Sequence, residues 1–188
     1  MIKIKICGLS RPEDMEAANE AMPDYIGFVF AESRRRVTFA QAERLRARLR
    51  REITPVGVFV GAKPEDILAL YHAGVIELAQ LHGGESEEEI ARLPMPVIKA
   101  VLPHESRETG ARFLLLDSGA GSGRPFDWSR IGHMEKPWFL AGGISPANIH
   151  KALECRPYAI DLSSGAETNG VKDRDKMIYF TRKVRDFI

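Results

Sequence analysis

Short hydrophobic runs recur along the chain and alternate with segments of a different period. Eight of these runs have the length of a β-strand; they cover residues 1–8, 25–30, 56–60, 76–81, 97–101, 113–116, 138–141 and 158–162. Between most of them, apolar residues recur at intervals of three and four, as in a helix with one face on a core. Strands that alternate with helices predict an α/β fold, either a closed eight-stranded barrel or a doubly wound open sheet.

The first hydrophobic run predicts a β-strand that ends at a candidate catalytic residue. Ile2, Ile4 and Ile6 alternate with lysines, so a period of two places the isoleucines on one face of a strand. Cys7 follows at the carboxyl end of this strand. In a parallel barrel the loops that leave the carboxyl ends form the active site, so Cys7 is a candidate catalytic residue.

Helix starts are expected at several polar residues. Ser10 is expected to cap a helix that has Pro12 in its first turn. Thr38 and Ser86 are expected to cap two further helices, because each is followed three residues later by Gln or Glu. The last helix is expected from about Lys172.

The spacing of these elements favours the closed barrel. Runs such as residues 57–60 do not alternate, which is typical of parallel strands that are buried on both faces. Residues 102–112 contain Pro103, Gly110 and few apolar side chains, so a short or irregular fifth crossover is expected. We therefore predict an α/β fold with one domain over residues 1–188, a (β/α)8 TIM barrel slightly below the usual ~200 residues.

Composition excludes several classes of partner. The net charge of +1 argues against a nucleic-acid-binding protein. No apolar stretch approaches the roughly 20 residues of a membrane span, and no export signal is recognised, so a cytoplasmic protein is expected. Cys7 and Cys155 are expected to be free thiols, and they belong to distant elements without metal-ligand spacing. No metal is expected.

Glycine-rich loops follow the last two predicted strands. Gly142 and Gly143 follow the seventh strand, and Ser164 and Gly165 follow the eighth. Glycine lets backbone N–H groups approach an anion, and residues 145–146 are expected to open a helix with a partly positive amino end. Either loop alone could be only a tight turn. Together, in these barrel positions, they predict a phosphate site.

Polar residues at the ends of strands complete the candidate site. They are Cys7, Arg35, His82, Asp117 and Asp161. Each has a structural alternative: the cysteine could be a small buried hydrophobe, Asp117 a turn former, and His82 a half-buried histidine with ordinary partners.

Nine motifs spread over nearly the whole chain carry a family resemblance. They are Lys5-Ile6-Cys7-Gly8, Gly27-Phe28-Val29-Phe30, Ser33-Arg34-Arg35, Val56-Gly57-Val58-Phe59, Gln80-Leu81-His82-Gly83, Leu115-Leu116-Asp117, Gly121-Ser122-Gly123 with Phe126-Asp127-Trp128, Ala141-Gly142-Gly143-Ile144, and Asp161-Leu162-Ser163-Ser164-Gly165. In this order they resemble phosphoribosylanthranilate isomerase. The resemblance implies a (β/α)8 barrel without metal or cofactor. It also implies an isomerase of tryptophan biosynthesis that converts N-(5-phosphoribosyl)anthranilate, a small phosphosugar, into 1-(2-carboxyphenylamino)-1-deoxyribulose 5-phosphate by an Amadori rearrangement.

The resemblance also implies roles for individual residues. Cys7 matches the general base, Asp117 the general acid, and Arg35 the arginine that holds the anthranilate carboxylate. His82 and Asp161 match polar residues that line the pocket.

Two departures from the family pattern affect these roles. The loop over residues 117–123 is several residues shorter than the common form, which bears on how the site closes. The arginine loop is shorter by about one residue, so the choice of Arg35 over Arg36 depends on the alignment of Ser33 and Val37. The sequence leaves open whether the chain is a monomer or a homodimer.

Two other readings remain at this point. The related histidine-pathway isomerase rearranges a substrate with two phosphates, but it uses two aspartates, whereas the first strand here ends in Cys7. We also expect no second glycine-pair loop after strands three and four, unlike the two glycine-rich phosphate sites of that isomerase. The other alternative is a binding protein and not an enzyme, namely a non-catalytic phosphosugar-binding domain. The presence of both Cys7 and Asp117 argues against it.

Overall fold

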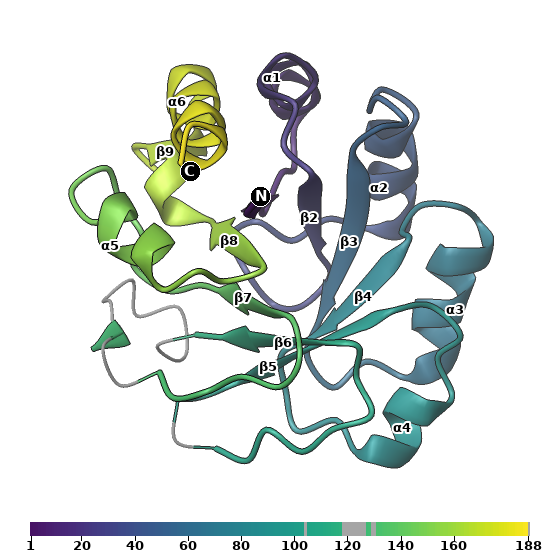
Figure 1. Cartoon of the computed structure of the whole chain (residues 1–188). Coiled ribbons are helices and arrows are strands. Elements are labelled where there is room, and N and C mark those ends of the chain that lie inside the picture. Colours follow the sequence, from purple (N-terminus) through teal and green to yellow (C-terminus); the bar gives the residue numbers. More distant parts are fainter. Residues whose placement is uncertain (104, 118–126, 129–130, 188) are drawn as a thin grey trace.

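The computed structural model describes residues 1–103, 105–117, 127–128 and 131–187. Eight parallel strands close into a barrel in the order of the chain, and helices surround it (Figure 1). The strands are β1 (Lys3–Cys7), β2 (Tyr25–Val29), β3 (Thr54–Phe59), β4 (Leu78–Leu81), β5 (Val97–Val101), β6 (Phe113–Leu116), β7 (Trp138–Leu140) and β8 (Ala159–Leu162). The predicted closed barrel is therefore confirmed, and the open sheet is wrong.

Six α-helices lie in the described part of the chain. They are α1 (Pro12–Ala21), α2 (Phe39–Arg46), α3 (Pro64–His72), α4 (Glu87–Ala91), α5 (Ile149–Glu154) and α6 (Arg174–Arg185). The described residues of the segment 102–112 contain no helix, which confirms the irregular fifth crossover. The short helix that we expected near Trp128 falls mostly on residues outside the described part.

The barrel has two hydrophobic layers. Ile4 and Ile6 are fully buried in the outer layer, between the strands and the helices. Phe113 and Phe139 lie in the inner layer, where their rings meet edge to face at 5.7 Å. Because the interior is also packed, the second face of β1 is buried too, and Lys5 on that face is 0 % exposed. Lys5 thus points into the barrel and not to solvent.

The expected helix starts are partly confirmed. Thr38 and Ser86 cap α2 and α4 with their hydroxyl groups, as predicted. The expected cap at Ser10 is wrong, because α1 begins after Arg11. Asp14, one turn into the helix, accepts hydrogen bonds from the backbone N–H of Ser10 at 2.9 Å and of Arg11 at 3.0 Å. Its carboxylate satisfies the amides that a serine cap would have served.

A small hairpin precedes the last helix and was not predicted. Strands β9 (Glu167–Thr168) and β10 (Val171–Lys172) pair in antiparallel fashion. Strands of two residues are too short to show any periodicity in the sequence. The last helix consequently starts slightly later than expected, with Asp173 as its cap. It packs beside α1, so the two ends of the chain meet on one side of the barrel (Figure 1).

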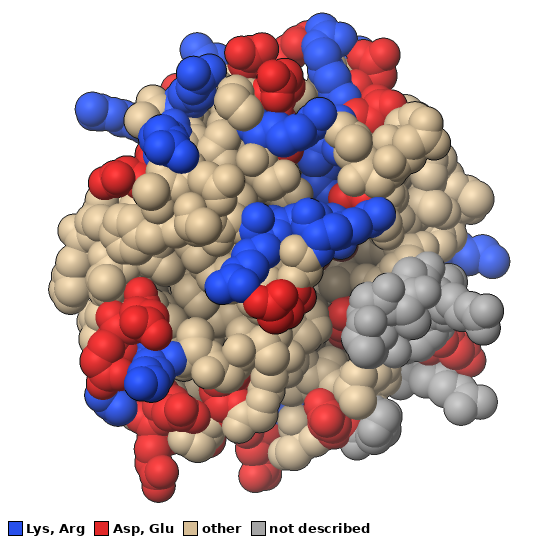
Figure 2. Space-filling model, turned by 180° about the vertical axis from the view of Figure 1, so that it is seen from behind, with Lys and Arg blue, Asp and Glu red and all other residues tan. Residues whose placement is uncertain are grey.

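The surface carries charges of both signs. Figure 2 shows a band of Lys and Arg side chains across the middle of one face, with Asp and Glu side chains nearby and toward the edges. In the described residues, no helix is both long enough and apolar enough to cross a membrane.

Candidate active site

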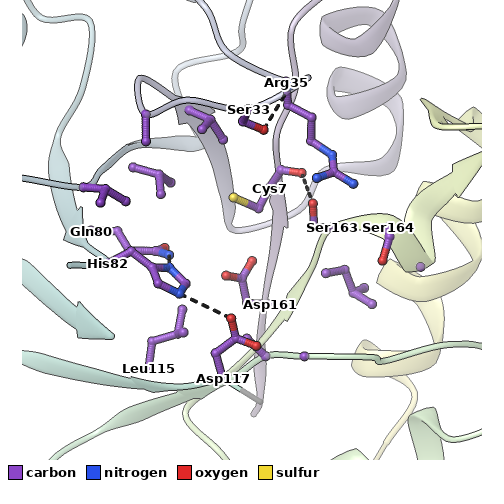
Figure 3. A pocket seen from close by; sticks show the side chains of 18 of the residues that line it. Cys7, Ser33, Arg35, Gln80, His82, Leu115, Asp117, Asp161, Ser163 and Ser164 are labelled. Atoms are coloured by element: carbon purple, nitrogen blue, oxygen red, sulfur yellow. Dashed lines mark hydrogen bonds and ion pairs between the residues drawn. The ribbon is translucent and has the colours of Figure 1, made fainter. Parts of the chain in front are cut away.

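A cavity of about 570 Å³ opens at the carboxyl ends of the strands. Its size suits a small organic ligand. All nine residues predicted from the sequence line it: Cys7, Arg35, His82, Asp117, Gly142, Gly143, Asp161, Ser164 and Gly165. Figure 3 shows the labelled members of this set around one space, with Cys7 and Asp117 on different sides and Asp161 between them in this view.

Cys7 ends β1 with its side chain directed into the barrel mouth. It lies opposite Gly27 in the register of β1 and β2. A Cβ atom at Gly27 would come within 2.6 Å of the Cys7 sulfur, so only glycine leaves room for the thiol at this place. Burial raises the pKa of Cys7, while the neighbouring Lys5 ammonium acts in the opposite direction.

A buried ion pair lies on β1 and β8 beneath the thiol. Lys5 Nζ donates to Asp161 Oδ2 at 2.8 Å, and the two residues face each other in the strand register. Asp161 was predicted as a site residue, but Lys5 was not. An alternation of Ile and Lys indicates a half-exposed strand, and only closure of the barrel turns the lysine face inward.

Asp117 follows β6 and faces His82, which follows β4. Asp117 Oδ2 lies 3.3 Å from His82 Nε2, and the Asp117 side chain is 13 % exposed. On its other side, the His82 ring approaches the amide of Gln80, with Nδ1 3.3 Å from Nε2 (Figure 3). The imidazole therefore has a polar neighbour at each ring nitrogen, which fixes its orientation toward Asp117.

Arg35 reaches the cavity across Gly8. Gly8 has φ +83°, and a Cβ atom there would lie 2.3 Å from Arg35 Cδ, so glycine is required beneath the arginine. Arg36 does not line the cavity and instead pairs with Glu32. This placement agrees with the choice of Arg35 over Arg36.

Glu167 holds Arg35 in place and was missed in the sequence. Its carboxylate accepts from Arg35 Nε at 2.6 Å, from Arg34 Nη2 at 2.7 Å and from Lys172 Nζ at 2.6 Å. Burial acts to raise the pKa of Glu167, but the hydrogen bonds from Arg35 and Lys172 outweigh it, and the pKa is lowered. Glu167 is thus a charged anchor for three cations at one edge of the cavity.

The glycine loops after β7 and β8 meet beside the cavity. Gly142 and Gly143 have φ of 85° and 66°, conformations that glycine adopts without strain. A Cβ atom at Gly165 would lie 2.1 Å from the Ile144 carbonyl oxygen, so the two loops are in direct contact. Within the described part of the chain, the N–H groups of Gly143 and Ser164 donate to no protein acceptor.

The helix after the first glycine loop starts later than predicted. We expected it to open at residues 145–146, whereas α5 begins at Ile149. Ser145 N donates to Asn148 Oδ1 at 2.7 Å, and Asn148 Nδ2 donates to Gly143 O at 2.9 Å. This turn takes the place of the expected first helical turn. The cavity is therefore lined here by the loop residues Gly142, Gly143 and Ile144 and not by the first turn of α5.

A second glycine pair does occur after β4, contrary to our expectation. Gly83 and Gly84 follow this strand, and Gly61 follows β3. The Glu85 carboxylate accepts from the N–H of Gly61 and of Gly83, both at 2.9 Å. The amides of this second loop pair are thus satisfied by a carboxylate of the chain itself.

The two cysteines are free thiols, as predicted. Cys155, at the end of α5, lies outside the cavity and contacts the Lys151 carbonyl oxygen. Among the described residues, no group of three or more His, Cys, Asp or Glu side chains could hold a metal ion. The ionisable groups that line the described part of the cavity include the Cys7 thiol, the carboxylates of Asp117 and Asp161, and the Arg35 guanidinium.

Comparisons with known proteins agree on one family. The family described as N-(5′-phosphoribosyl)anthranilate (PRA) isomerase matches residues 4–183. The N-(5′-phosphoribosyl)anthranilate isomerase of Endomicrobium trichonymphae is 46 % identical over 198 residues, which cover 98 % of this chain and 99 % of that protein.

Solved structures give the same result. The crystal structure of phosphoribosyl anthranilate isomerase from Thermus thermophilus superposes with a TM-score of 0.89 at 34 % identity, covering 100 % of both chains. A phosphoribosyl anthranilate isomerase in complex with reduced 1-(o-carboxyphenylamino)-1-deoxyribulose 5-phosphate superposes with a TM-score of 0.81 at 32 % identity, covering 98 % of this chain and 99 % of that one. With its closed barrel and full-length similarity, the chain belongs to the N-(5′-phosphoribosyl)anthranilate isomerase family and is an isomerase of tryptophan biosynthesis.

Proposed function

We propose that this isomerase converts N-(5-phosphoribosyl)anthranilate into 1-(2-carboxyphenylamino)-1-deoxyribulose 5-phosphate by general acid–base catalysis, with Asp117 as the acid and Cys7 as the base. The main support is that both side chains enter one cavity from strands on different sides of the barrel mouth. A ribose ring between them would present its ring oxygen to one group and its C2′ hydrogen to the other.

The first step opens the sugar ring. Asp117 gives a proton to the furanose ring oxygen, and the bond from this oxygen to C1′ breaks. The nitrogen lone pair forms a C1′=N double bond, which leaves an iminium ion. The Asp117 side chain is 13 % exposed, which limits the access of water to this proton.

The second step moves a proton from C2′. The Cys7 thiolate takes this proton, and the electron pair of the C2′–H bond forms a C1′=C2′ double bond. The C=N electrons return to nitrogen. The resulting enaminol becomes the ketone when C1′ gains a proton and the C2′ hydroxyl loses one. No oxidant or reductant is needed, which agrees with a site built from acid and base groups.

Two anionic groups of the substrate have matching partners in the cavity. We assign the anthranilate carboxylate to Arg35, since a guanidinium meets a carboxylate through two parallel hydrogen bonds. We assign the phosphate to the loops of Gly142, Gly143, Ser164 and Gly165, whose backbone N–H groups suit an anion. His82 and Asp161 line the space between these two ends.

The decisive experiment is turnover of freshly generated N-(5-phosphoribosyl)anthranilate. Loss of the anthranilate-type fluorescence should be faster with the purified protein than in buffer and should persist in the presence of a metal chelator. Conversion no faster than spontaneous breakdown would contradict the proposed reaction. Cytoplasmic location, the single domain over residues 1–188 and the choice between monomer and homodimer stay predictions.

A further inference from the structure

The ammonium group of Lys5 lies in the barrel interior directly below the reacting thiol. Lys5 and Cys7 are two residues apart on β1, so their side chains point to the same side of the strand. Lys5 is 0 % exposed, and its Nζ atom is held by Asp161 Oδ2 at 2.8 Å. A buried charge of this kind is costly to maintain, and the cavity chemistry described above assigns it no task.

The Lys5 ammonium is held by Asp161 and can still donate to a second acceptor. Asp161 Oδ1 is buried and has no hydrogen-bond partner among the described residues, so the carboxylate is bound at one oxygen only. A buried ammonium has three donors and is fully satisfied only by several acceptors. The sulfur of Cys7, on the same face of the same strand, is such an acceptor when it is a thiolate.

We propose that Lys5 is a positioning residue for the reaction: its buried ammonium, fixed by Asp161, stabilises the thiolate of Cys7 that removes the substrate proton. This inference rests on the proposed role of Cys7 as the base. It identifies the source of the charge that a buried thiol needs before it can act.

The other charged groups near the thiol have partners of their own. Lys172, on β10, is bound to Glu167 and to the Ser163 carbonyl oxygen. Arg35, in the loop after β2, is also bound to Glu167. Across the cavity, His82 and Asp117 face each other. Among these three cations, Lys5 alone lies on the same strand and the same strand face as Cys7, and its own partner is Asp161.

The directions of the pKa shifts agree with this arrangement. Burial is the largest influence on Cys7 and raises its pKa; attraction to Lys5 comes next and lowers it, ahead of the opposing influence of Asp161. For Lys5, burial lowers the pKa, but Asp161 and Cys7 together outweigh it, and the pKa is raised. A raised pKa keeps Lys5 charged near neutral pH, and its charge offsets part of the cost of burying the thiolate.

The test measures the thiol itself and not turnover. In a Cys155→Ser background, Cys7 is the single thiol, and its rate of alkylation by iodoacetamide is followed by intact mass over a range of pH. Lys5→Met should move the midpoint of this titration upward, and the rate near pH 7 should fall about tenfold or more, since an opposite charge within ~4–6 Å shifts a pKa by 1–3 units. An unmoved or lowered midpoint would overturn the proposal.

Lys3→Met is the matched control. Lys3 lies on the same strand and loses the same charge, but its ammonium pairs with Asp24 and is partly exposed. The pH midpoint of Cys7 alkylation in Lys3→Met should stay at the wild-type value. Lys172→Met should shift the midpoint less than Lys5→Met does, and a larger shift there would overturn the assignment to Lys5.

A second variant covers the case in which Lys5→Met does not fold. Lys5→Met leaves Asp161 without its cation, whereas Lys5→Met/Asp161→Asn removes both charges and leaves no buried ion unpaired. Because Lys5 acts on the thiol more strongly than Asp161 does, the double variant should still show a raised midpoint, by a smaller amount. A midpoint at or below that of the wild type would overturn the proposal.

The proposed role of Lys5 and the proposed role of Cys7 are tested by separate measurements. If Cys7→Ala keeps near-wild-type turnover, the proposed base is wrong, while the titration still reports whether Lys5 controls the thiol. If Cys7→Ala is inactive, the rise of kcat/KM with pH should move in the same direction as the alkylation midpoint in Lys5→Met. A purely structural Lys5 would lower the amount of folded enzyme and leave both midpoints in place.

Discussion

Arg35 and Glu167 meet through two parallel hydrogen bonds, Nε to Oε1 at 2.6 Å and Nη2 to Oε2 at 3.0 Å. They lie 132 positions apart in the chain, on the loop after β2 and on the hairpin after β8. Glu167 occupies the side edge of the guanidinium. In the part of the chain that the structure describes, no acceptor is found for Arg35 Nη1, so the end edge can serve a substrate carboxylate.

Replacing Arg35 should weaken substrate binding more than replacing its neighbour. We expect Arg35→Lys to raise KM about tenfold or more, because a hydrogen bond to a charged group contributes ~1.5–3 kcal/mol and 1.4 kcal/mol is a factor of ten. Arg36→Lys, the matched control, should have little effect, since Arg36 does not line the cavity and pairs with Glu32. Steady-state kinetics of both variants give the two KM values. A larger increase of KM in Arg36→Lys than in Arg35→Lys would assign the substrate carboxylate to Arg36.

Glu167→Gln should affect both stability and binding. It removes the anion that holds Arg35 and leaves the buried Lys172 without its counter-charge, and breaking a buried ion pair costs up to about 3–5 kcal/mol. We expect a lower Tm and a higher KM. A variant with wild-type Tm and KM would show that the cluster is not needed to orient the arginine.

The same residue should contribute to acid sensitivity. The pKa of Glu167 is lower in the folded chain than its ordinary 4.5, so its stabilising effect is present above about pH 4.5 and is lost as the pH falls through the folded value. Thermal unfolding of wild type and Glu167→Gln should therefore differ most near neutral pH and converge toward acid pH. A constant difference down to strongly acid pH would contradict this.

A negative charge in the first glycine loop should disturb phosphate binding. Gly143→Asp should raise KM about tenfold or more, because like charges placed together cost several kcal/mol. Gly143→Asn is the control, as it has nearly the same shape and the same tolerance of a positive φ without the charge. If the Asp and Asn variants fold and show equal KM values, the phosphate lies elsewhere.

Cys7 and Asp117 should be needed for turnover and not for binding. Cys7→Ala and Asp117→Asn are each expected to lower kcat roughly 10²–10⁴-fold, with KM little changed. Asp117→Asn is the sharper change, because it keeps the shape of the side chain but cannot deliver a proton. Near-wild-type kcat in folded Asp117→Asn would leave Asp117 as a turn former, and ring opening would need another acid.

The barrel and the residues at its strand ends could be predicted, because both follow from local patterns. Cys7 ends the first strand and Asp117 directly follows the sixth, and parallel strands bring such ends together. Lys5 could not be found in this way, since its alternation with isoleucine also describes a half-exposed strand. Glu167 lies in a strand of two residues, and its partner Arg35 is remote in the chain. Both become evident only when the barrel closes.

The Glu85 carboxylate bears on how substrate range could change in this family. It binds the amides of Gly61 and Gly83, which follow β3 and β4, across the barrel from the glycine loops after β7 and β8. Any anionic ligand group that bound these two amides would first have to displace the Glu85 carboxylate. Glu85 does not line the cavity. A mutation that removes its carboxylate would therefore free two backbone amides for an anionic ligand without adding any new contact, and a wider substrate range could evolve from such a change.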